Sequence, residues 1–203
     1  MATPARTLSD LIIPQPSSRV ASYARDALLI VGGSLIVAAL ARVSIPLQPV
    51  PVTGQTLGVL LVGAALGWQR GGLALIVYLV EGLVGLPVFA EGKVGLAVLQ
   101  GSTGGYLVGF ILAAALVGFL AEHGWDRTPW LTAAAMVLGN VAIYIVGVTW
   151  LTHVLSAVLP FNTAFHTAIQ FGVSPFLIGD AIKIIIAAAL LPTVTWLVRR
   201  NVA

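Results

Sequence analysis

Long apolar stretches that carry almost no charge restrict this chain to a membrane fold. Charged residues make up 8% of its 203 residues, against about 25% in a typical soluble domain, and hydrophobic residues make up 59%. The mean hydropathy of +1.03 is correspondingly high. The composition excludes a soluble globular enzyme and a disordered chain. It predicts a polytopic helical protein surrounded by membrane lipid.

Six apolar stretches are candidates for spanning helices, each of which needs about 17–25 residues. The second stretch is short and glycine-rich, so we expect a tilted or incomplete span, and glycine and proline interrupt the outer part of the third. We predict an all-α membrane protein, a six-transmembrane-helix bundle with extracytoplasmic binding loops. Residues 1–22 form a cytoplasmic segment and residues 23–200 a single membrane domain. The stretches are Ala27–Ala41, Thr56–Trp68, Gly72–Ala90, Tyr106–Ala121, Trp130–Leu151 and Pro175–Val198.

Arginine and lysine near the span ends indicate the orientation, because these residues are enriched in cytoplasmic loops. With a cytoplasmic N-terminus, seven arginines lie inside and only Arg42 and Lys93 lie outside. An even number of spans then places both termini in the cytoplasm, as in a multi-pass protein of the bacterial cytoplasmic membrane. Three longer connections, residues 43–55, 91–105 and 152–174, share the extracytoplasmic face.

Several classes of function lack the residues that they require. The few charges form no basic stripe, so no nucleic-acid partner is predicted. The chain has no cysteine, and the spacing of His153 and His166 does not suit a helical metal pair, so no metal site is predicted. It also lacks a P-loop, a Gly-x-Ser-x-Gly elbow and a His-Glu-x-x-His motif. We therefore predict no enzyme, no catalytic residue and no cofactor.

The first outer connection combines proline with apolar residues. Three prolines within six residues, ending at Pro51, stiffen the backbone in an extended form. Such a segment can serve as a strap over a pocket with little loss of entropy on binding. Thr53 and Gln55 then bring polar groups to the start of the next helix. A rigid connector without a binding role is the alternative.

The second outer connection ends in Gln100-Gly101-Ser102-Thr103-Gly104-Gly105-Tyr106. Ser102 or Thr103 can cap the helix that follows, and Gly104 allows a ligand or a neighbouring helix to approach the backbone. Tyr106 would begin the span. The segment is either a capped turn or part of a pocket lining.

Ionisable residues at membrane depth mark the other candidate positions. Asp180 and Lys183 are three residues apart and share one helix face. Each charge costs at least about 2.5–3.5 kcal/mol in the bilayer, so both face the bundle interior, either for binding or as a structural ion pair. Asn140 either binds a ligand or links helices. Glu81 could pair with Lys183 or Arg42, or take part in a proton path.

These motifs together resemble the BioY family, the biotin-specific substrate-binding (S) components of energy-coupling factor transporters. Residues 45–56 resemble the first outer loop of that family, and residues 85–90, 104–106 and the Asp180-x-x-Lys183 motif match in order and spacing. The resemblance covers about Tyr23 to Arg200. It implies a six-helix protein with a high-affinity biotin pocket near the outer face. The docking stripe Ala-x-x-x-Ala-x-x-x-Ala of the family is represented only by Ser34-x-x-x-Ala38-x-x-x-Arg42.

The resemblance also implies roles and partners. Asp180 and Asn140 would contact the ureido ring of biotin, and Lys183 would contact either the ureido oxygen or the carboxylate. The strap and aromatic residues such as Phe89 and Tyr106 would cover the thioether ring and the chain. The expected partners are a transmembrane coupling subunit and two cytoplasmic ATPase subunits, which would hydrolyse ATP.

Two other functions remain open on the sequence. The chain could be the S component for another vitamin, although few acidic residues are available for a cation such as thiamine. It could also be a stand-alone proton-coupled transporter, with Glu81 and Asp180 as a relay. An intramembrane enzyme is disfavoured because no nucleophile and base set is present.

Overall fold

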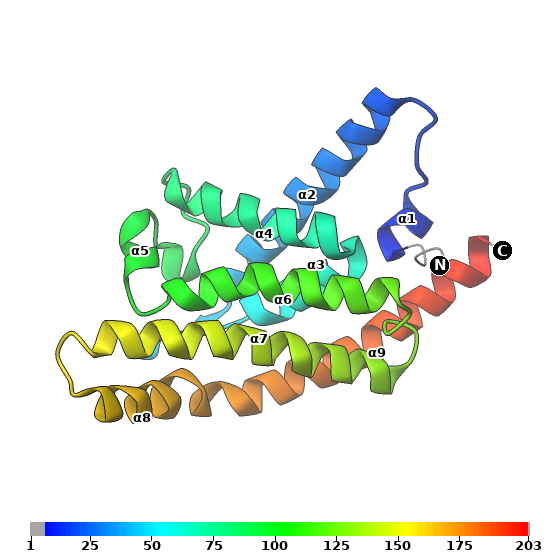
Figure 1. Ribbon diagram of the computed structural model, residues 1–203. Coiled ribbons are helices and arrows are strands. Elements are labelled where there is room, and N and C mark those ends of the chain that lie inside the picture. Colours follow the sequence, from blue (N-terminus) through cyan, green and yellow to red (C-terminus); the bar gives the residue numbers. More distant parts are fainter. Residues whose placement is uncertain (1–6, 203) are drawn as a thin grey trace.

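The computed structural model describes residues 7–202, and side chains through residue 200. The described chain is largely helical and carries one small antiparallel hairpin (Figure 1). Its helices are α1 (Leu8–Ile12), α2 (Arg19–Ala41), α3 (Gln55–Leu66), α4 (Trp68–Leu83), α5 (Leu96–Gln100), α6 (Gly104–Glu122), α7 (Pro129–Leu155), α8 (Phe161–Gly172) and α9 (Leu177–Val202). The strands are β1 (Ser44–Ile45) and β2 (Val52–Thr53), and 3-10 turns occupy Ala90–Gly92 and Ser174–Phe176.

Each of the six apolar stretches lies mainly on one helix, namely α2, α3, α4, α6, α7 or α9, although the third continues past the end of α4 at Leu83. Among the described residues, however, only four helical segments are long and apolar enough to span a membrane: α2, α6, α7 and the continuous run from α8 into α9. Helices α3 and α4 have 12 and 16 residues, fewer than the about 17 that a perpendicular span needs. The bundle of apolar helices is therefore established, whereas the predicted number of six spans is not confirmed.

Helix α6 lies at the centre of the bundle and packs against α3, α4 and α7 (Figure 1). The contact with α3 is close because Gly63 has no side chain. A Cβ at that position would stand 2.5 Å from the carbonyl oxygen of Ala114, well inside van der Waals contact. Small residues allow such close helix packing in membrane proteins, where apolar lipid provides little driving force for association.

The connection predicted at residues 152–174 is mostly helical, which the sequence analysis did not anticipate. Helix α7 continues to Leu155, and α8 occupies most of the remaining residues. Ala164, Ala168 and Gly172 are buried at a helical spacing of four residues, on the face that packs against α7. Small residues on this face let α8 fold back along α7. The larger side chains lie on the opposite face, so a count of apolar residues alone did not predict this helix.

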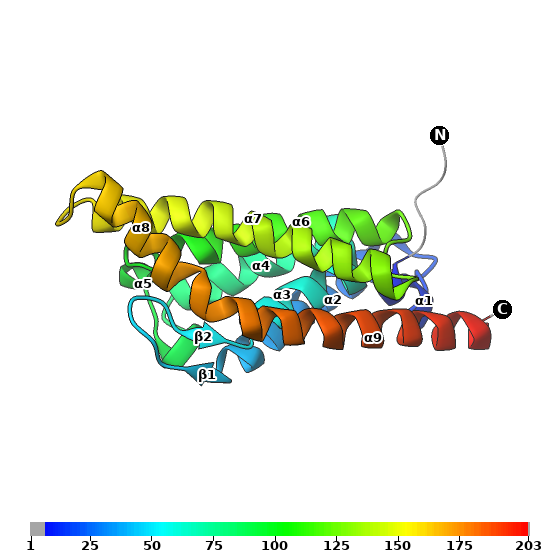
Figure 2. The same ribbon diagram turned by 90° about the horizontal axis from the view of Figure 1, so that it is seen from below.

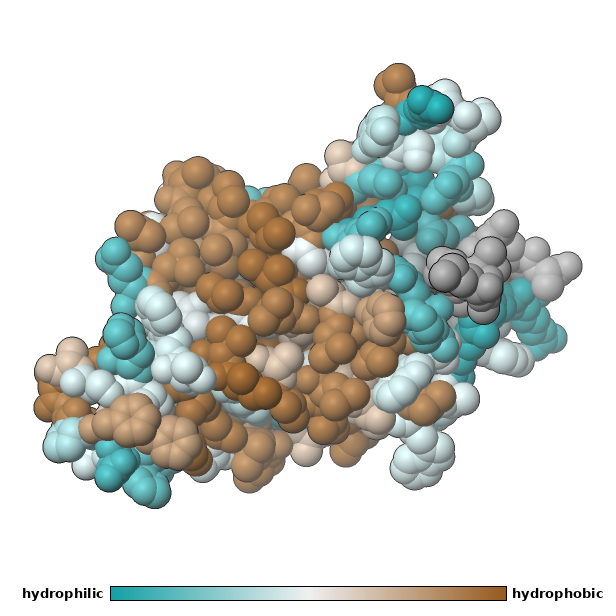
Figure 3. All heavy atoms as spheres, in the orientation of Figure 1, coloured by the Kyte–Doolittle hydropathy of each residue, from teal (hydrophilic) through white to brown (hydrophobic). Residues whose placement is uncertain are grey.

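The two ends of the molecule differ in structure. The β-hairpin, α5 and α8 gather at one end, and α1 lies with the end of α9 at the other (Figure 2). Hydrophobic residues form a broad band between the two ends in the space-filling view (Figure 3). Helix α1 packs against α3 and α9, so both described ends of the chain lie at the same end of the bundle.

Candidate functional site

A pocket of about 640 Å³, its open mouth included, lies at the end of the molecule that carries the hairpin. The strap, the 3-10 turn after α4, and helices α6, α7 and α9 provide its walls. The pocket is lined by Val50, Pro51, Thr53, Gln55, Thr56, Phe89, Ala90, Lys93, Val98, Thr103, Tyr106, Leu107, Phe110, Ile143, Tyr144, Phe176 and Lys183.

A first polar network surrounds Lys183. Its ammonium donates hydrogen bonds to Asp180 Oδ1 at 3.2 Å and to Thr56 Oγ1 at 2.7 Å. Thr56 and the hydroxyl of Tyr144 both donate to the Asp180 carboxylate. The side chains of Asp180 and Lys183 are 5% and 14% exposed. Lys183 lines the pocket and Asp180 lies behind it, so the carboxylate fixes the lysine while one ammonium proton stays available.

The sequence placed Asp180 and Lys183 on one helix face, and the structure brings them into contact as an ion pair. Sequence reasoning missed Thr56 and Tyr144. Tyr144 lies one turn after Asn140 on α7, a position that shares its helix face and could have been considered. Thr56 follows Gln55 directly, but only the tertiary fold shows that it meets α9.

A second polar network ties the strap to α4. Thr53 donates a hydrogen bond from its hydroxyl to Gln55 Oε1 at 2.9 Å, and Gln55 donates from Nε2 to the Tyr78 hydroxyl at 2.6 Å. Tyr78 donates in turn to the carbonyl of Val88 at 3.0 Å. Its ring meets Phe89 edge to face, with centroids 5.6 Å apart. The buried Tyr78 was not predicted, and it fixes both the strap and the aromatic wall.

The proline-rich strap lies over the pocket. Val50, Pro51 and Thr53 contribute to the lining, and the pairing of β1 with β2 holds the base of the hairpin. The Ser102 hydroxyl donates to the carbonyl of Pro49 at 2.5 Å, which joins the strap to the turn before α6. Ser102 therefore does not cap α6, because its hydroxyl donates to the strap instead.

Gly104 and Tyr106 play different parts at the start of α6. Gly104 is not a lining residue, and a Cβ there would overlap the carbonyl oxygen of Leu99. The ring of Tyr106 lines the pocket and stacks on Phe176, with centroids 6.4 Å apart. Its hydroxyl points elsewhere and donates to the carbonyl of Gly172 at 2.9 Å. Tyr106 thus joins the pocket wall to the end of α8.

Asn140 and Glu81 do not line the pocket. Asn140 is buried on α7, and its Oδ1 has no hydrogen-bond partner among the described residues. Glu81 accepts a hydrogen bond from the Ser34 hydroxyl at 3.0 Å, which links α4 to α2. Arg42 donates instead to the carbonyl of Pro87. The structure therefore gives Glu81 an interhelical contact and shows no ion pair with Lys183 or Arg42.

A second lysine in the lining, Lys93, was counted from the sequence only as an outer charge. It follows the 3-10 turn and lies 2.6 Å from Glu91 Oε2, with its side chain 51% exposed. Lys93 therefore stands at the mouth of the pocket, whereas Lys183 lies deeper. No group of three potential metal ligands is found among residues 7–202.

The sequence profile described as "BioY family" matches residues 13–200 of this chain. The chain belongs to the BioY family. The matched residues include every side chain of the two polar networks and both lysines of the pocket. The match therefore covers the site described above.

Named relatives support this assignment. The chain is 43% identical over 148 residues to "Biotin transporter BioY" of Thermotoga maritima, covering 73% of this chain and 82% of the relative. It is 39% identical over 155 residues to "Biotin transporter BioY" of Rhizobium etli, covering 73% and 79%. A crystal structure described as the S-component for biotin from an ECF-type ABC transporter matches with a TM-score of 0.72 and 24% identity, over 89% of this chain and 95% of that one. That likeness shows a shared fold.

Proposed function

We propose that this BioY-family chain binds biotin in the pocket and serves as the substrate-binding component of an energy-coupling factor transporter. The observation that carries the proposal is an apolar pocket with one held lysine inside and a second lysine at its mouth. The names of the relatives agree with this ligand.

Biotin matches the distribution of polar groups in the pocket. Its ureido oxygen would accept the free proton of Lys183, and a ureido N–H would donate to the Tyr144 oxygen, whose own proton is directed to Asp180. The carboxylate of its chain would then pair with Lys93 at the mouth. Phe89 and Tyr106 would cover the thioether ring and the chain. Asp180 acts in this arrangement through Lys183 and Tyr144.

The remaining residues of the predicted site take supporting roles in this arrangement. Pro51, Thr53 and Gln55 would form the wall under the strap, and Gly104 would allow the close turn that starts α6. Asn140 would contact the ligand only if the pocket deepens by one turn along α7, because its unpartnered oxygen lies one turn beyond Ile143 and Tyr144.

Membrane topology and partners complete the proposal. Helices α3 and α4 would join the four longer segments as shorter or tilted spans. The end that carries α1 would be cytoplasmic, a placement supported by the excess of arginine there and by the common location of both described chain ends. The sequence holds no P-loop, so ATP would be hydrolysed by two ATPase subunits that join through a transmembrane coupling subunit.

The alternatives fit the pocket less well. The lining presents the ammonium groups of Lys93 and Lys183, while Glu91 and Asp180, which pair with them, are not lining residues. No lining carboxylate is therefore offered to a cationic vitamin such as thiamine. A proton relay from Glu81 to Asp180 would require a chain of hydrogen bonds. Among the described residues, Glu81 bonds to Ser34 and Asp180 bonds to Thr56, Tyr144 and Lys183, and no hydrogen bond joins the two groups.

Uptake of radiolabelled biotin tests this proposal against the proton-coupled alternative. Cells would express the chain alone, with its coupling subunit and ATPases, or with ATPases whose P-loop lysine is replaced. We expect concentrative uptake only with intact partners. Uptake by the chain alone that follows the proton gradient would instead support the stand-alone transporter.

A further inference from the structure

The turn between α4 and α5 has an unusual backbone for the residues that it carries (Figure 1). Glu91 adopts φ 60° and ψ 16°, and it is the one non-glycine residue with a positive φ in the described part of the chain. The next residue, Gly92, also has a positive φ, of 73°. Glycine is the usual residue for this left-handed conformation, because a Cβ crowds the backbone there. A glutamate at such a position indicates a use for its side chain.

The turn places Glu91 in contact with a lysine of the pocket. Lys93 Nζ lies 2.6 Å from Glu91 Oε2, and the two side chains are 51% and 29% exposed. Backbone hydrogen bonds close the turn, from Gly92 to the carbonyl of Phe89 at 3.0 Å and from Lys93 to the carbonyl of Ala90 at 3.2 Å. The ion pair is therefore part of a hydrogen-bonded turn.

Neighbouring segments anchor the turn on both sides. Phe89 is buried against Gly82 of α4, where a Cβ would overlap the Phe89 ring. The amide of Gly95 donates to the carbonyl of Gly82 at 2.8 Å, and Arg42 donates to the carbonyl of Pro87. Side chains on such a fixed turn lose less conformational freedom when they pair than the side chains of an ordinary surface ion pair.

Glu91 provides the negative charge at the mouth of the pocket. Within residues 7–202, the connections at the pocket end carry three charged side chains, those of Arg42, Glu91 and Lys93. Lys93 lines the pocket and Glu91 does not. A ligand carboxylate that reaches Lys93 therefore meets an ammonium group that already has a partner.

We propose that Glu91 is a resident carboxylate that competes with the carboxylate of the ligand for Lys93, so that it limits the affinity for an acidic ligand and eases its release. The inference rests on the proposed function, because it requires that the ligand carboxylate reach Lys93. As the ligand leaves, Glu91 pairs with Lys93 again, and the ammonium group is not left without a partner. Glu91 is thus a positioning residue that acts through Lys93.

Calorimetry with biotin and biotin methyl ester tests this competition. Glu91→Gln keeps the length of the side chain and removes its charge. An exposed ion pair changes an equilibrium constant by up to about fivefold. We therefore expect biotin to bind Glu91→Gln about two- to fivefold more tightly than the parent protein, with the affinity for the ester unchanged. Glu91→Asp, which keeps the charge, is the matched control and should gain less.

Glu91→Gly separates the carboxylate from the conformation of the turn. Glycine favours the positive φ of this position and also lacks the carboxylate, so it should tighten biotin binding as Glu91→Gln does. A gain in Glu91→Gly without a gain in Glu91→Gln would assign the effect to the backbone and overturn the competition. Equal losses for biotin and the ester in both variants would overturn it as well, because Glu91 would then only support the turn.

Replacement of the lysine shows whether Glu91 acts through it. In a Lys93→Met background, Glu91→Gln should no longer tighten the binding of biotin. A gain of the same size in that background would mean that Glu91 repels the ligand directly, which would refute the competition.

The rate of release provides a second readout. Bound radiolabelled biotin would be chased with unlabelled biotin, and release from Glu91→Gln should be slower by about the factor that calorimetry gives for affinity. An unchanged release rate in a variant that binds more tightly would contradict the role in release.

The parent protein separates this inference from the proposed function. If it does not bind biotin, the proposed ligand is refuted and the inference is overturned with it. If it binds biotin and the ratio of biotin affinity to ester affinity is the same in Glu91→Gln, the inference alone is refuted.

Discussion

Replacement of each pocket lysine by methionine should show which one binds the carboxylate of biotin. A charge-assisted hydrogen bond contributes roughly 1.5–3 kcal/mol. The Lys93 side chain is half exposed and Lys183 is largely buried, so solvent screens the first more strongly. At about 1.4 kcal/mol per decade, Lys93→Met should weaken binding about tenfold and Lys183→Met up to about a hundredfold.

Biotin methyl ester makes this comparison specific. The ester removes the carboxylate charge and should bind the parent protein about tenfold more weakly than biotin, on the same energy scale. In Lys93→Met the ester should lose almost nothing further, whereas in Lys183→Met the full ester penalty should persist. Lys93→Arg, which keeps the charge, serves as the matched control. An ester penalty that disappears in Lys183→Met and persists in Lys93→Met would show that biotin binds in the reverse orientation.

Three further outcomes are expected. Gly104→Ala should lower thermal stability by about 1–3 kcal/mol or more because its Cβ overlaps the carbonyl of Leu99, whereas Gly32→Ala, with open space around it, should not; equal melting curves would contradict the packing. Burial raises the pKa of Asp126, so its ionised form destabilises the fold: Asp126→Asn should stabilise the protein at neutral pH, with the gain vanishing at acid pH, and a pH-independent difference would refute this. Impermeant thiol reagents should label cysteines at Gln48 and Asn162 on intact cells but not one at Ser17; the opposite pattern would reverse the topology.

The local pattern of apolar residues was sufficient to predict most of the long helices. Each apolar stretch became a helix because in a bilayer the backbone must satisfy its own hydrogen bonds. The contact between Asp180 and Lys183 was predictable for a similar reason, since a separation of three residues places two side chains on one helix face. The break after α4 followed from glycine and proline in the third stretch.

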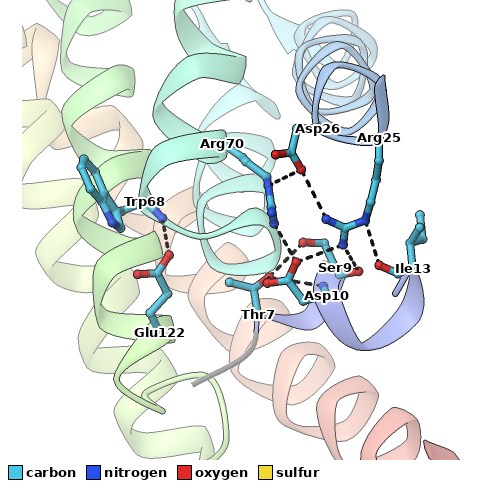
Figure 4. Close-up of polar contacts among 9 residues, drawn as sticks. All are labelled: Thr7, Ser9, Asp10, Ile13, Arg25, Asp26, Trp68, Arg70 and Glu122. Carbon is cyan, nitrogen blue, oxygen red and sulfur yellow. Dashed lines mark hydrogen bonds and ion pairs between the residues drawn. The ribbon is translucent and has the colours of Figure 1, made fainter. Parts of the chain in front are cut away.

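The remaining features depend on contacts that sequence spacing does not encode. Thr56 meets Lys183 across 127 residues, and Tyr144 meets Asp180 across 36. Glu81 accepts a hydrogen bond from Ser34 of α2, and Ser34 and Ala38, two of the three positions that correspond to the docking stripe of the family, are buried. Helix α8 was not predicted from the sequence because small, polar and aromatic residues are mixed along its segment. Arg25 and Arg70, which the sequence analysis used only to assign orientation, form ion pairs with Asp10 and Asp26 that join α1, α2 and α4 (Figure 4).

Isothermal titration of the purified chain, without partner subunits, tests the central claim most directly. The account predicts saturable binding of one biotin per chain, with binding weakened in Lys183→Met and no comparable heat from thiamine or riboflavin. Clear heat from another vitamin together with none from biotin would contradict it.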